Sequence, residues 1–195
     1  MIAMTLGEIA KVISGVIHGD IDEQAKLSEL THIHFDSRKI AKGDVFIALL
    51  GENADGHDFV DDALKNGAAL SIVTKQVPGP HILVQDVLSS LGSLAHHVRN
   101  QIPGLKVIGI TGSQGKTTTK DMLFSILAAE GESVAAEGSF NNDLGVPLTI
   151  LRCKETTQFC ITEMGARHGG DISALTKIAA PDVGAVLKVG NAHIG

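Results

Sequence analysis

The first half of the chain switches repeatedly between helical and strand-like spacing of its apolar residues. Thr5 and Glu8 have the spacing of a capping box, and apolar residues follow them at helical intervals. A second helix is expected over residues 58–66, with Gly67 at its end. Apolar or alternating runs predict strands over residues 16–18, 31–35, 45–50, 69–74 and 81–84. The pattern predicts a small α/β domain with its own core over residues 1–84.

Strands and helices alternate about four times in the rest of the chain, which predicts a mostly parallel sheet covered on both faces. The expected strands begin near residues 107, 133, 158 and 183, and the expected helices near residues 86, 116, 144 and 171. In the helix that begins at Lys116, we expect Met122, Leu123, Ile126 and Leu127 to face the core. The predicted fold class is therefore α/β, with a second domain over residues 85–195.

The stretch LKVIGITGSQGKTTT, residues 105–119, has the layout of a phosphate-binding P-loop: an apolar strand, a glycine-rich turn and a helix. Glycines let backbone N–H groups point at a polyphosphate, and the helix N-terminus adds partial positive charge. Lys116 can reach the phosphates, and the Thr117 hydroxyl can bind Mg²⁺. The strict pattern requires a glycine where Ile110 stands. An ordinary glycine-rich turn is the alternative, but the strand and helix around it favour the P-loop.

Polar residues follow each expected strand of the second domain, where ligands of parallel sheets collect. Glu163 follows an apolar strand and is a candidate Mg²⁺ partner for the P-loop. Asn141 and Asn142 could bind phosphate or metal, or could form Asx-turns. His193 also follows a strand, but its position alone favours a structural role, because Mg²⁺ prefers oxygen.

Two polar clusters stand out in the first domain. Asp36, Ser37 and Arg38 follow a strand, and residues 55–57, Asp-Gly-His, lie in a loop. Such groups can hydrogen-bond a nucleobase edge or a diphosphate. Spacing alone favours the simpler interpretation of the first cluster, a turn with an Asp–Arg surface pair.

Composition narrows the class of protein. The net charge of −6, the lack of a Lys/Arg run and the absence of Trp and Tyr argue against a nucleic-acid partner. No apolar stretch reaches membrane-spanning length, so no membrane span is expected. Cys153 and Cys160 fit neither a zinc pair nor a disulfide framework, and this is typical of core thiols in a cytoplasmic protein.

Taken together, these motifs resemble the Mur ligase family of peptidoglycan synthesis, in the branch that adds D-alanyl-D-alanine. The resemblance covers nearly the whole chain. It is carried by the sequence stretches GSQGKTT (112–118), DSR (36–38), KGDVFIA (42–48), DGHDF (55–59), NNDLGVPL (141–148), EMG (163–165), GDI (170–172) and AHIG (192–195). The family has an N-terminal domain for a UDP-sugar, a central ATPase domain and a C-terminal domain. The chain resembles the first and part of the second, and we expect a fragment that is inactive alone.

The resemblance implies ATP-dependent amide formation through an acyl phosphate, with ATP and Mg²⁺ as cofactors. The implied substrates are UDP-N-acetylmuramoyl-tripeptide and D-alanyl-D-alanine, and a cytoplasmic monomer is expected. Implied catalytic roles fall to Lys116, Glu163 and His193, and implied metal ligation to Thr117, Glu163 and His193. ATP binding is assigned to Gly112, Ser113, Gln114, Gly115, Lys116, Thr117, Thr118, Asn141 and Asn142. Substrate binding is assigned to Asp36, Ser37, Arg38, Asp55, Gly56 and His57.

Two alternatives remain open from the sequence. One is a different P-loop phosphotransferase or amide ligase of the same superfamily, such as a folate-polyglutamate type. The other is a nucleotide-binding regulatory module without turnover. ADP formation that depends on both peptide substrates separates the expected ligase from both alternatives.

Overall fold

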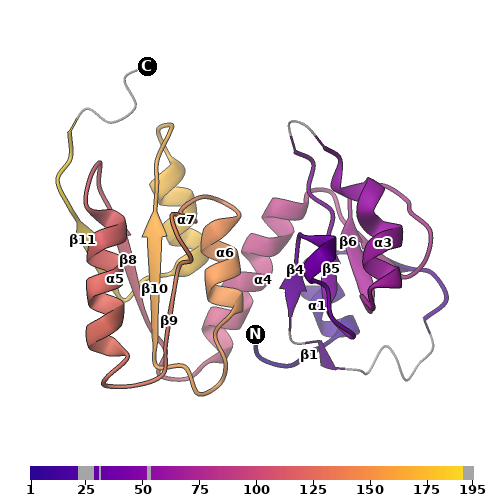
Figure 1. Ribbon diagram of the computed structural model, residues 1–195, viewed down its shortest axis with the longest axis horizontal. Helices are drawn as coiled ribbons and strands as arrows, with labels where there is room; N and C mark the ends of the chain where they lie inside the picture. The colour runs from indigo at the N-terminus through magenta and orange to yellow at the C-terminus, as the bar shows by residue number, and fades with distance from the viewer. Residues whose placement is uncertain (22–28, 31, 52–53, 191–195) are drawn as a thin grey trace. The chain divides into compact units, whose positions relative to one another are not determined.

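The computed structural model describes the chain except for residues 22–28, 31, 52–53 and 191–195. The chain divides into two compact units, Ile2–Leu94 and Ala95–Gly195, and Met1 belongs to the second. We refer to them as the N-terminal and C-terminal units. None of the helices in the described part of the chain is long and apolar enough to cross a membrane. The predicted α/β class is confirmed in both units (Figure 1).

The N-terminal unit is built on a five-stranded sheet with the order β2-β7-β6-β5-β4. Its strands are β2 (Val16–His18), β4 (Ile33–His34), β5 (Val45–Ile47), β6 (Leu70–Val73) and β7 (His81–Leu83). Neighbours from β4 to β7 are parallel, and β2 is antiparallel to β7. Each strand is shorter than or equal to its predicted length. A further antiparallel pair, β1 (Met4–Thr5) with β3 (Glu29–Leu30), is too short to show as a pattern in the sequence.

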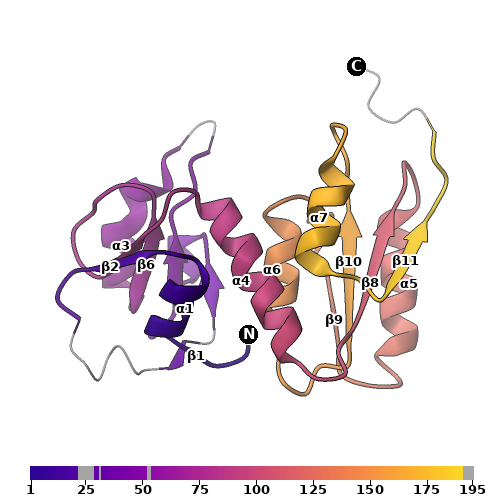
Figure 2. The ribbon, with the colours of Figure 1, turned by 180° about the vertical axis from the view of Figure 1, so that it is seen from behind.

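Helices lie on both sides of this sheet. The helix α1 (Leu6–Val12) begins with the predicted capping box, in which the Thr5 hydroxyl accepts from Glu8 N–H and the Glu8 carboxylate accepts from Thr5 N–H. The helix α3 (Val60–Lys65) follows the 3-10 turn η2 (Gly56–Phe59) and lies on the opposite side of the sheet from α1 (Figure 2). The core on the α3 side consists of Ile40, Phe46, Ala48, Val60, Ala63 and Val73.

The C-terminal unit contains a parallel four-stranded sheet with the order β11-β8-β10-β9. Its strands are β8 (Lys106–Thr111), β9 (Ser133–Ala135), β10 (Phe159–Met164) and β11 (Val183–Val186). The helix α5 (Lys116–Leu127) lies on one side of β10, and α6 (Gly145–Leu151) and α7 (Asp171–Ala179) lie on the other (Figures 1 and 2). The predicted parallel sheet with helices on both faces is confirmed.

The buried side of α5 was predicted only in part. Leu123 and Leu127 pack on the sheet beside Ile108, Ile110 and Ile161, as expected. The prediction that the other two apolar residues face the core is wrong, because Met122 and Ile126 are 63% and 62% exposed. Both lie on the α5 surface that turns away from the sheet. Helical spacing therefore identified the apolar residues of one stripe but not which of them are buried.

The helix α4 (Val87–Gln101) begins where predicted, with Ser89 N–H donating to the Asp86 carboxylate. It contributes residues to both units, whereas the predicted domain boundary falls just before it.

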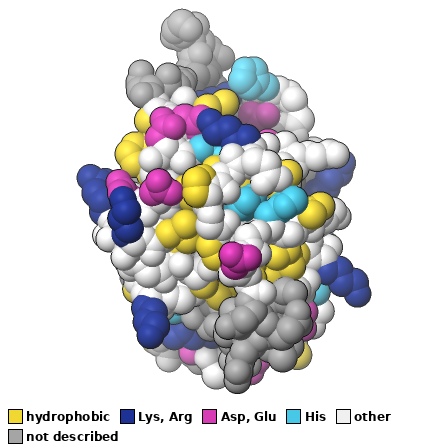
Figure 3. All heavy atoms as spheres, turned by 90° about the vertical axis from the view of Figure 1, so that its right-hand side faces the viewer, with side chains coloured by type: hydrophobic (Ala, Val, Ile, Leu, Met, Phe, Trp, Pro, Cys, Tyr) yellow, Lys and Arg dark blue, Asp and Glu magenta, His cyan; other side chains and the backbone are white. Residues whose placement is uncertain are grey.

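On the face shown in Figure 3, Lys and Arg side chains lie scattered among acidic and histidine side chains rather than gathered in a stripe.

Candidate nucleotide and substrate sites

The glycine-rich turn between β8 and α5 has the backbone that its sequence requires. Gly112 and Gly115 have φ values of 144° and 84°, a region that residues with a side chain rarely adopt. A Cβ atom on residue 112 would also lie 2.8 Å from Cβ of Leu187. Gly115 occupies the N-cap position of α5, so Lys116 begins the helix and its first N–H groups face the turn. The turn therefore has the geometry of an anion-binding loop at a helix N-terminus.

Two residues of this turn, Lys116 and Ser113, make hydrogen bonds within the unit. Lys116 Nζ donates to the Gly112 carbonyl oxygen across 2.7 Å, so its ammonium group lies against the backbone of the loop. Ser113 is bound to the segment after β11, because its hydroxyl donates to Gly190 O at 2.8 Å and its N–H donates to Lys188 O at 2.9 Å. The side chains of Gln114 and Thr118 are exposed. The Gly112 carbonyl takes one of the three N–H groups of the Lys116 ammonium, whereas Ser113 links the loop to the 188–190 segment.

Three predicted residues converge beside the loop. Glu163, near the end of β10, is only 1% exposed, and its two carboxylate oxygens have different partners. Thr117 Oγ1 donates to Oε2 of Glu163 across 2.9 Å, and Asn141 Nδ2 donates to Oε1 across 2.9 Å. Hydroxyl, carboxylate and carboxamide oxygens form the donor set that Mg²⁺ prefers. These side chains therefore fit a magnesium ion next to a bound polyphosphate.

The described residues contain no group of three or more His, Cys, Asp and Glu side chains that could hold a metal ion. Such a group is not required for Mg²⁺ beside a nucleotide, since this ion commonly takes one or two protein ligands and completes its shell with phosphate oxygens and water. His193, the third predicted metal ligand, lies outside the described residues.

The two neighbouring asparagines have different contacts. Asn141 donates to Glu163, and its carbonyl oxygen accepts from Gly165 N–H at 2.7 Å. Asn142 instead contacts the first residue of α6, because its side-chain oxygen accepts from Gly145 N–H at 3.0 Å. The sequence left a ligand role and an Asx-turn role open for both. The structure brings Asn141 to the Glu163 carboxylate and gives Asn142 a local contact with the backbone three residues on.

The DSR cluster of the N-terminal unit forms the 3-10 turn η1 (Ser37–Lys39). Asp36 caps it by accepting from Arg38 N–H, and its two carboxylate oxygens also accept from Arg38 Nε and Nη2. This pairing with the guanidinium lowers the pKa of Asp36 to about 2. The side chain of Arg38 is nevertheless 86% exposed. The guanidinium is thus held in place by Asp36 while most of its surface remains open to a ligand.

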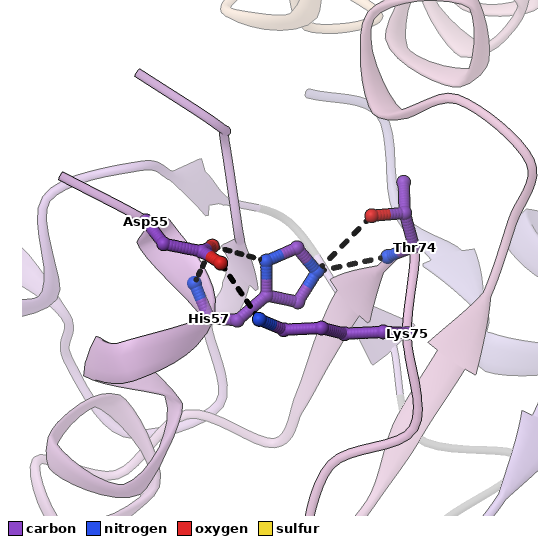
Figure 4. A network of polar contacts seen from close by, with 4 residues as sticks. All are labelled: Asp55, His57, Thr74 and Lys75. Carbon is purple, nitrogen blue, oxygen red and sulfur yellow. Dashed lines mark hydrogen bonds and ion pairs between the residues drawn. The ribbon is translucent and has the colours of Figure 1, made fainter. Parts of the chain in front are cut away.

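The second cluster is a network centred on His57 (Figure 4). His57 Nε2 accepts from Thr74 N–H at 3.0 Å, so the ring proton belongs on Nδ1, which faces Asp55. Lys75 Nζ donates to the other oxygen of Asp55 at 2.7 Å, and this bond is the largest cause of the lowered pKa of Asp55. His57 is buried, and both of its nitrogens are used inside the unit. Gly56 approaches the Leu49 backbone so closely that a Cβ atom would lie 2.5 Å from Leu49 N. The network therefore fixes the loop to the end of β6.

The structure thus gathers the predicted nucleotide residues in the C-terminal unit and the predicted sugar-nucleotide residues in the N-terminal unit. Sequence reasoning missed several polar residues that hold these sites together: Thr74, Lys75 and Lys120. Lys120 had one usable signal, since it lies three residues after Thr117 on the same helix. Nothing in the sequence pattern pointed to Thr74 and Lys75.

Comparison with known proteins gives a consistent result for both units. A family model described as "Mur ligase middle domain" matches residues 110–195, and one described as "Mur ligase family, catalytic domain" matches residues 29–99. A curated relative from Mycobacterium bovis, UDP-N-acetylmuramoyl-tripeptide--D-alanyl-D-alanine ligase, is 42% identical over all of this chain and 43% of its own length. The chain therefore spans less than half of the curated relatives that it matches.

Solved structures agree with the sequence matches. A crystal structure of MurF from Acinetobacter baumannii superposes with a TM-score of 0.89 at 37% identity, over 99% of this chain and 42% of that one. A MurF ligase from Thermotoga maritima in complex with ADP gives a TM-score of 0.76 at 39% identity, over 84% of this chain and 38% of that one. The predicted resemblance is confirmed, and the chain belongs to the Mur ligase family.

Proposed function

We propose that the chain is the UDP-sugar-binding and ATP-binding part of an ATP-dependent amide ligase of peptidoglycan precursor synthesis. The complete enzyme adds D-alanyl-D-alanine to UDP-N-acetylmuramoyl-tripeptide in the cytoplasm. One observation carries this proposal: in a chain with these relatives, Thr117 and Asn141 converge on the buried Glu163 directly beside the glycine-rich turn. The relatives named for this reaction and the ADP complex of one of them support the same assignment.

The proposed reaction must bring two anions together. The substrate carboxylate attacks the γ-phosphorus of ATP, an acyl phosphate forms and ADP leaves; the amine of D-alanyl-D-alanine then displaces phosphate from the acyl carbon. Lys116 and the N–H groups at the start of α5 neutralise and orient the phosphates. Mg²⁺, when bound, screens the charge between phosphate and carboxylate. Thr117, Glu163 and the downstream His193 are the side chains that we propose hold it.

The N-terminal unit is proposed to bind the uridine diphosphate end of the substrate. Ser37 and the exposed guanidinium of Arg38 are the main candidates, because Asp36 orients the guanidinium and Arg matches diphosphate oxygens in a bidentate manner. Asp55, Gly56 and His57 are weaker candidates for direct contact, since the side chains of Asp55 and His57 already bind each other, Lys75 and Thr74.

Titration calorimetry with UDP-N-acetylmuramoyl-tripeptide tests the proposal, because binding does not require turnover. We expect saturable binding that is weaker in Arg38→Ala and nearly unchanged in Lys39→Ala, which removes a neighbouring exposed charge. Plain UDP serves as the control for the nucleotide end alone. A folded chain that binds Mg-ATP but no UDP-sugar would instead favour a different P-loop ligase or phosphotransferase, or a nucleotide-binding module without turnover.

A further inference from the structure

Lys120 is a buried lysine whose ammonium group binds two backbone carbonyls and lies beside one carboxylate. Its side chain lies on α5 and the residue is only 3% exposed. Nζ donates to Ala136 O at 2.8 Å and to Gly138 O at 3.0 Å, and it lies 3.1 Å from Oδ1 of Asp121. Burying an ammonium group is costly unless it is fully hydrogen-bonded. The position therefore uses Lys to hold two specific carbonyl groups of one loop.

The loop held by Lys120 is the one that carries Asn141. It begins at Ala136, directly after β9, and Gly138 turns it with a φ of 52°. It then delivers the Asn141 carboxamide to Glu163, and the Asn141 carbonyl oxygen accepts from Gly165 N–H. Lys120 thus fixes the beginning of the loop, and Asn141 makes the contact at the nucleotide site.

The contacts of Thr117, Glu163, Asn141 and Lys120 form a closed circuit that begins and ends on α5. Thr117 and Lys120 are three residues apart and lie on the same side of α5. Thr117 binds one oxygen of Glu163, Asn141 binds the other, and Lys120 connects the Asn141 loop back to α5. If the Lys120 contacts are removed, two loop carbonyls lose their donor while the Thr117 contact persists.

We propose that Lys120 is a positioning residue for the nucleotide site, acting through the loop to hold Asn141 against Glu163. In this proposal Lys120 does not touch the nucleotide or the metal, because its buried ammonium group already faces two loop carbonyls and Asp121 within the unit. This inference rests on the proposed function, since it takes the Glu163 site to be the Mg-ATP site.

A double-mutant cycle tests whether Lys120 acts through Asn141. Calorimetry would give the Mg-ATP affinity of the chain, of Lys120→Met, of Asn141→Ala and of the double variant. We expect each single variant to lose affinity by about tenfold, within the range seen for groups that orient a metal's ligands. The double variant should bind Mg-ATP no more weakly than the single variant that has the lower affinity, because both changes remove the same interaction. Unchanged affinity in Lys120→Met, or losses that multiply, would overturn the proposal.

Control variants separate positioning from general destabilisation. Lys177→Met removes an exposed lysine from α7 and should bind Mg-ATP as the unchanged chain does. Lys120→Arg keeps a charged donor and should recover part of the lost affinity, whereas a role in packing alone predicts no recovery. If Lys120→Met does not fold, Lys120→Gln replaces it, since its carboxamide N–H can still donate to one carbonyl.

Hydrogen exchange gives a readout that needs no ligand. In Lys120→Met the amide of Gly165, which donates to Asn141 O, should exchange faster, while the amides of α7 keep their rates. An unchanged rate at Gly165 would overturn the positioning role. If the unchanged chain binds no Mg-ATP, the nucleotide assignment fails, but the exchange experiment still decides whether Lys120 holds the loop.

Discussion

Thr117 Oγ1 donates to Oε2 of Glu163 across 2.9 Å and joins the first turn of α5 to the end of β10. The carboxylate is buried and lies next to the N-terminus of the helix, directly beside the glycine-rich turn. A hydroxyl and a carboxylate side by side, next to a glycine-rich turn, can share one Mg²⁺ or its water shell. This pair links the phosphate-binding turn to the proposed metal site.

We therefore predict that Glu163→Gln reduces the effect of Mg²⁺ on ATP binding. The amide keeps the shape of the side chain but removes the negative charge, so the gain in ATP affinity on adding Mg²⁺ should fall by about tenfold or more. Calorimetric titrations of ATP with Mg²⁺ and with EDTA measure that gain. Glu155→Gln, an exposed acid of the same unit, is the control. An unchanged gain in Glu163→Gln would place the metal elsewhere.

Lys116 gives a second prediction at the same site. Its ammonium group now binds the Gly112 carbonyl, and we expect it to bind phosphate oxygens when ATP is present. A hydrogen bond to a charged group is worth about 1.5–3 kcal/mol, so Lys116→Ala should lower the ATP affinity by about 10- to 100-fold. In a complete enzyme it should also abolish productive use of ATP. Lys177→Ala is the matched control, and retained turnover in Lys116→Ala would contradict the loop assignment.

The His57 network yields a prediction about stability rather than binding. His57→Ala removes a buried side chain and leaves the Thr74 N–H without its acceptor and Asp55 without one donor, so the free energy of unfolding should fall by about 1–3 kcal/mol. Urea denaturation measures the change, with the exposed Asp61→Ala as control. The affinity for the UDP-sugar should fall less than in Arg38→Ala. Lost binding with unchanged stability would instead show that His57 contacts the substrate directly.

Local signals made most of the fold predictable. The capping box of Thr5 and Glu8, the turn glycines and the apolar strand before the P-loop each depend on residues close together in the sequence, and the structure has these elements where predicted. Four strands of the N-terminal unit, β4 to β7, are shorter than predicted, because pairing with a neighbour and not the apolar run itself determines where a strand ends. The burial of Met122 and Ile126 was wrong because spacing does not reveal which edge of an apolar stripe meets the sheet.

The candidate site was predictable as a set of residue types but not as contacts. Glu163 follows from its place after an apolar strand, and Thr117 follows from the motif. The difference between Asn141 and Asn142 depends on the path of the loop after β9, which Lys120 fixes through backbone carbonyls 16 and 18 residues away. Contacts to backbone groups leave no trace in the pattern of side-chain types, so this part of the site required the structure.

Asp182 provides a pH-dependent prediction for the C-terminal unit. Its carboxylate accepts from Val107 N–H at 2.8 Å and pairs with Arg99 at 3.0 Å, tying the residues before β11 to β8 and α4. The bond from the Val107 amide is the largest cause of the lowered pKa of Asp182. A lowered pKa in the folded state means that the stabilisation is complete above the unfolded pKa of about 3.9 and is lost as the pH falls through the lower folded value.

Asp182→Asn should therefore cost about 1–3 kcal/mol of unfolding free energy at pH 7, because the charged acceptor is lost. The difference from the unchanged chain should shrink as the pH falls below about 4, since protonated Asp182 then resembles the amide. Urea denaturation of the C-terminal unit at a series of pH values measures this difference. Glu130→Gln, at an exposed position of the same unit, should show little cost at pH 7. A cost of Asp182→Asn that stays constant down to pH 3 would mean that packing around Asp182, not its charge, stabilises this corner of the sheet.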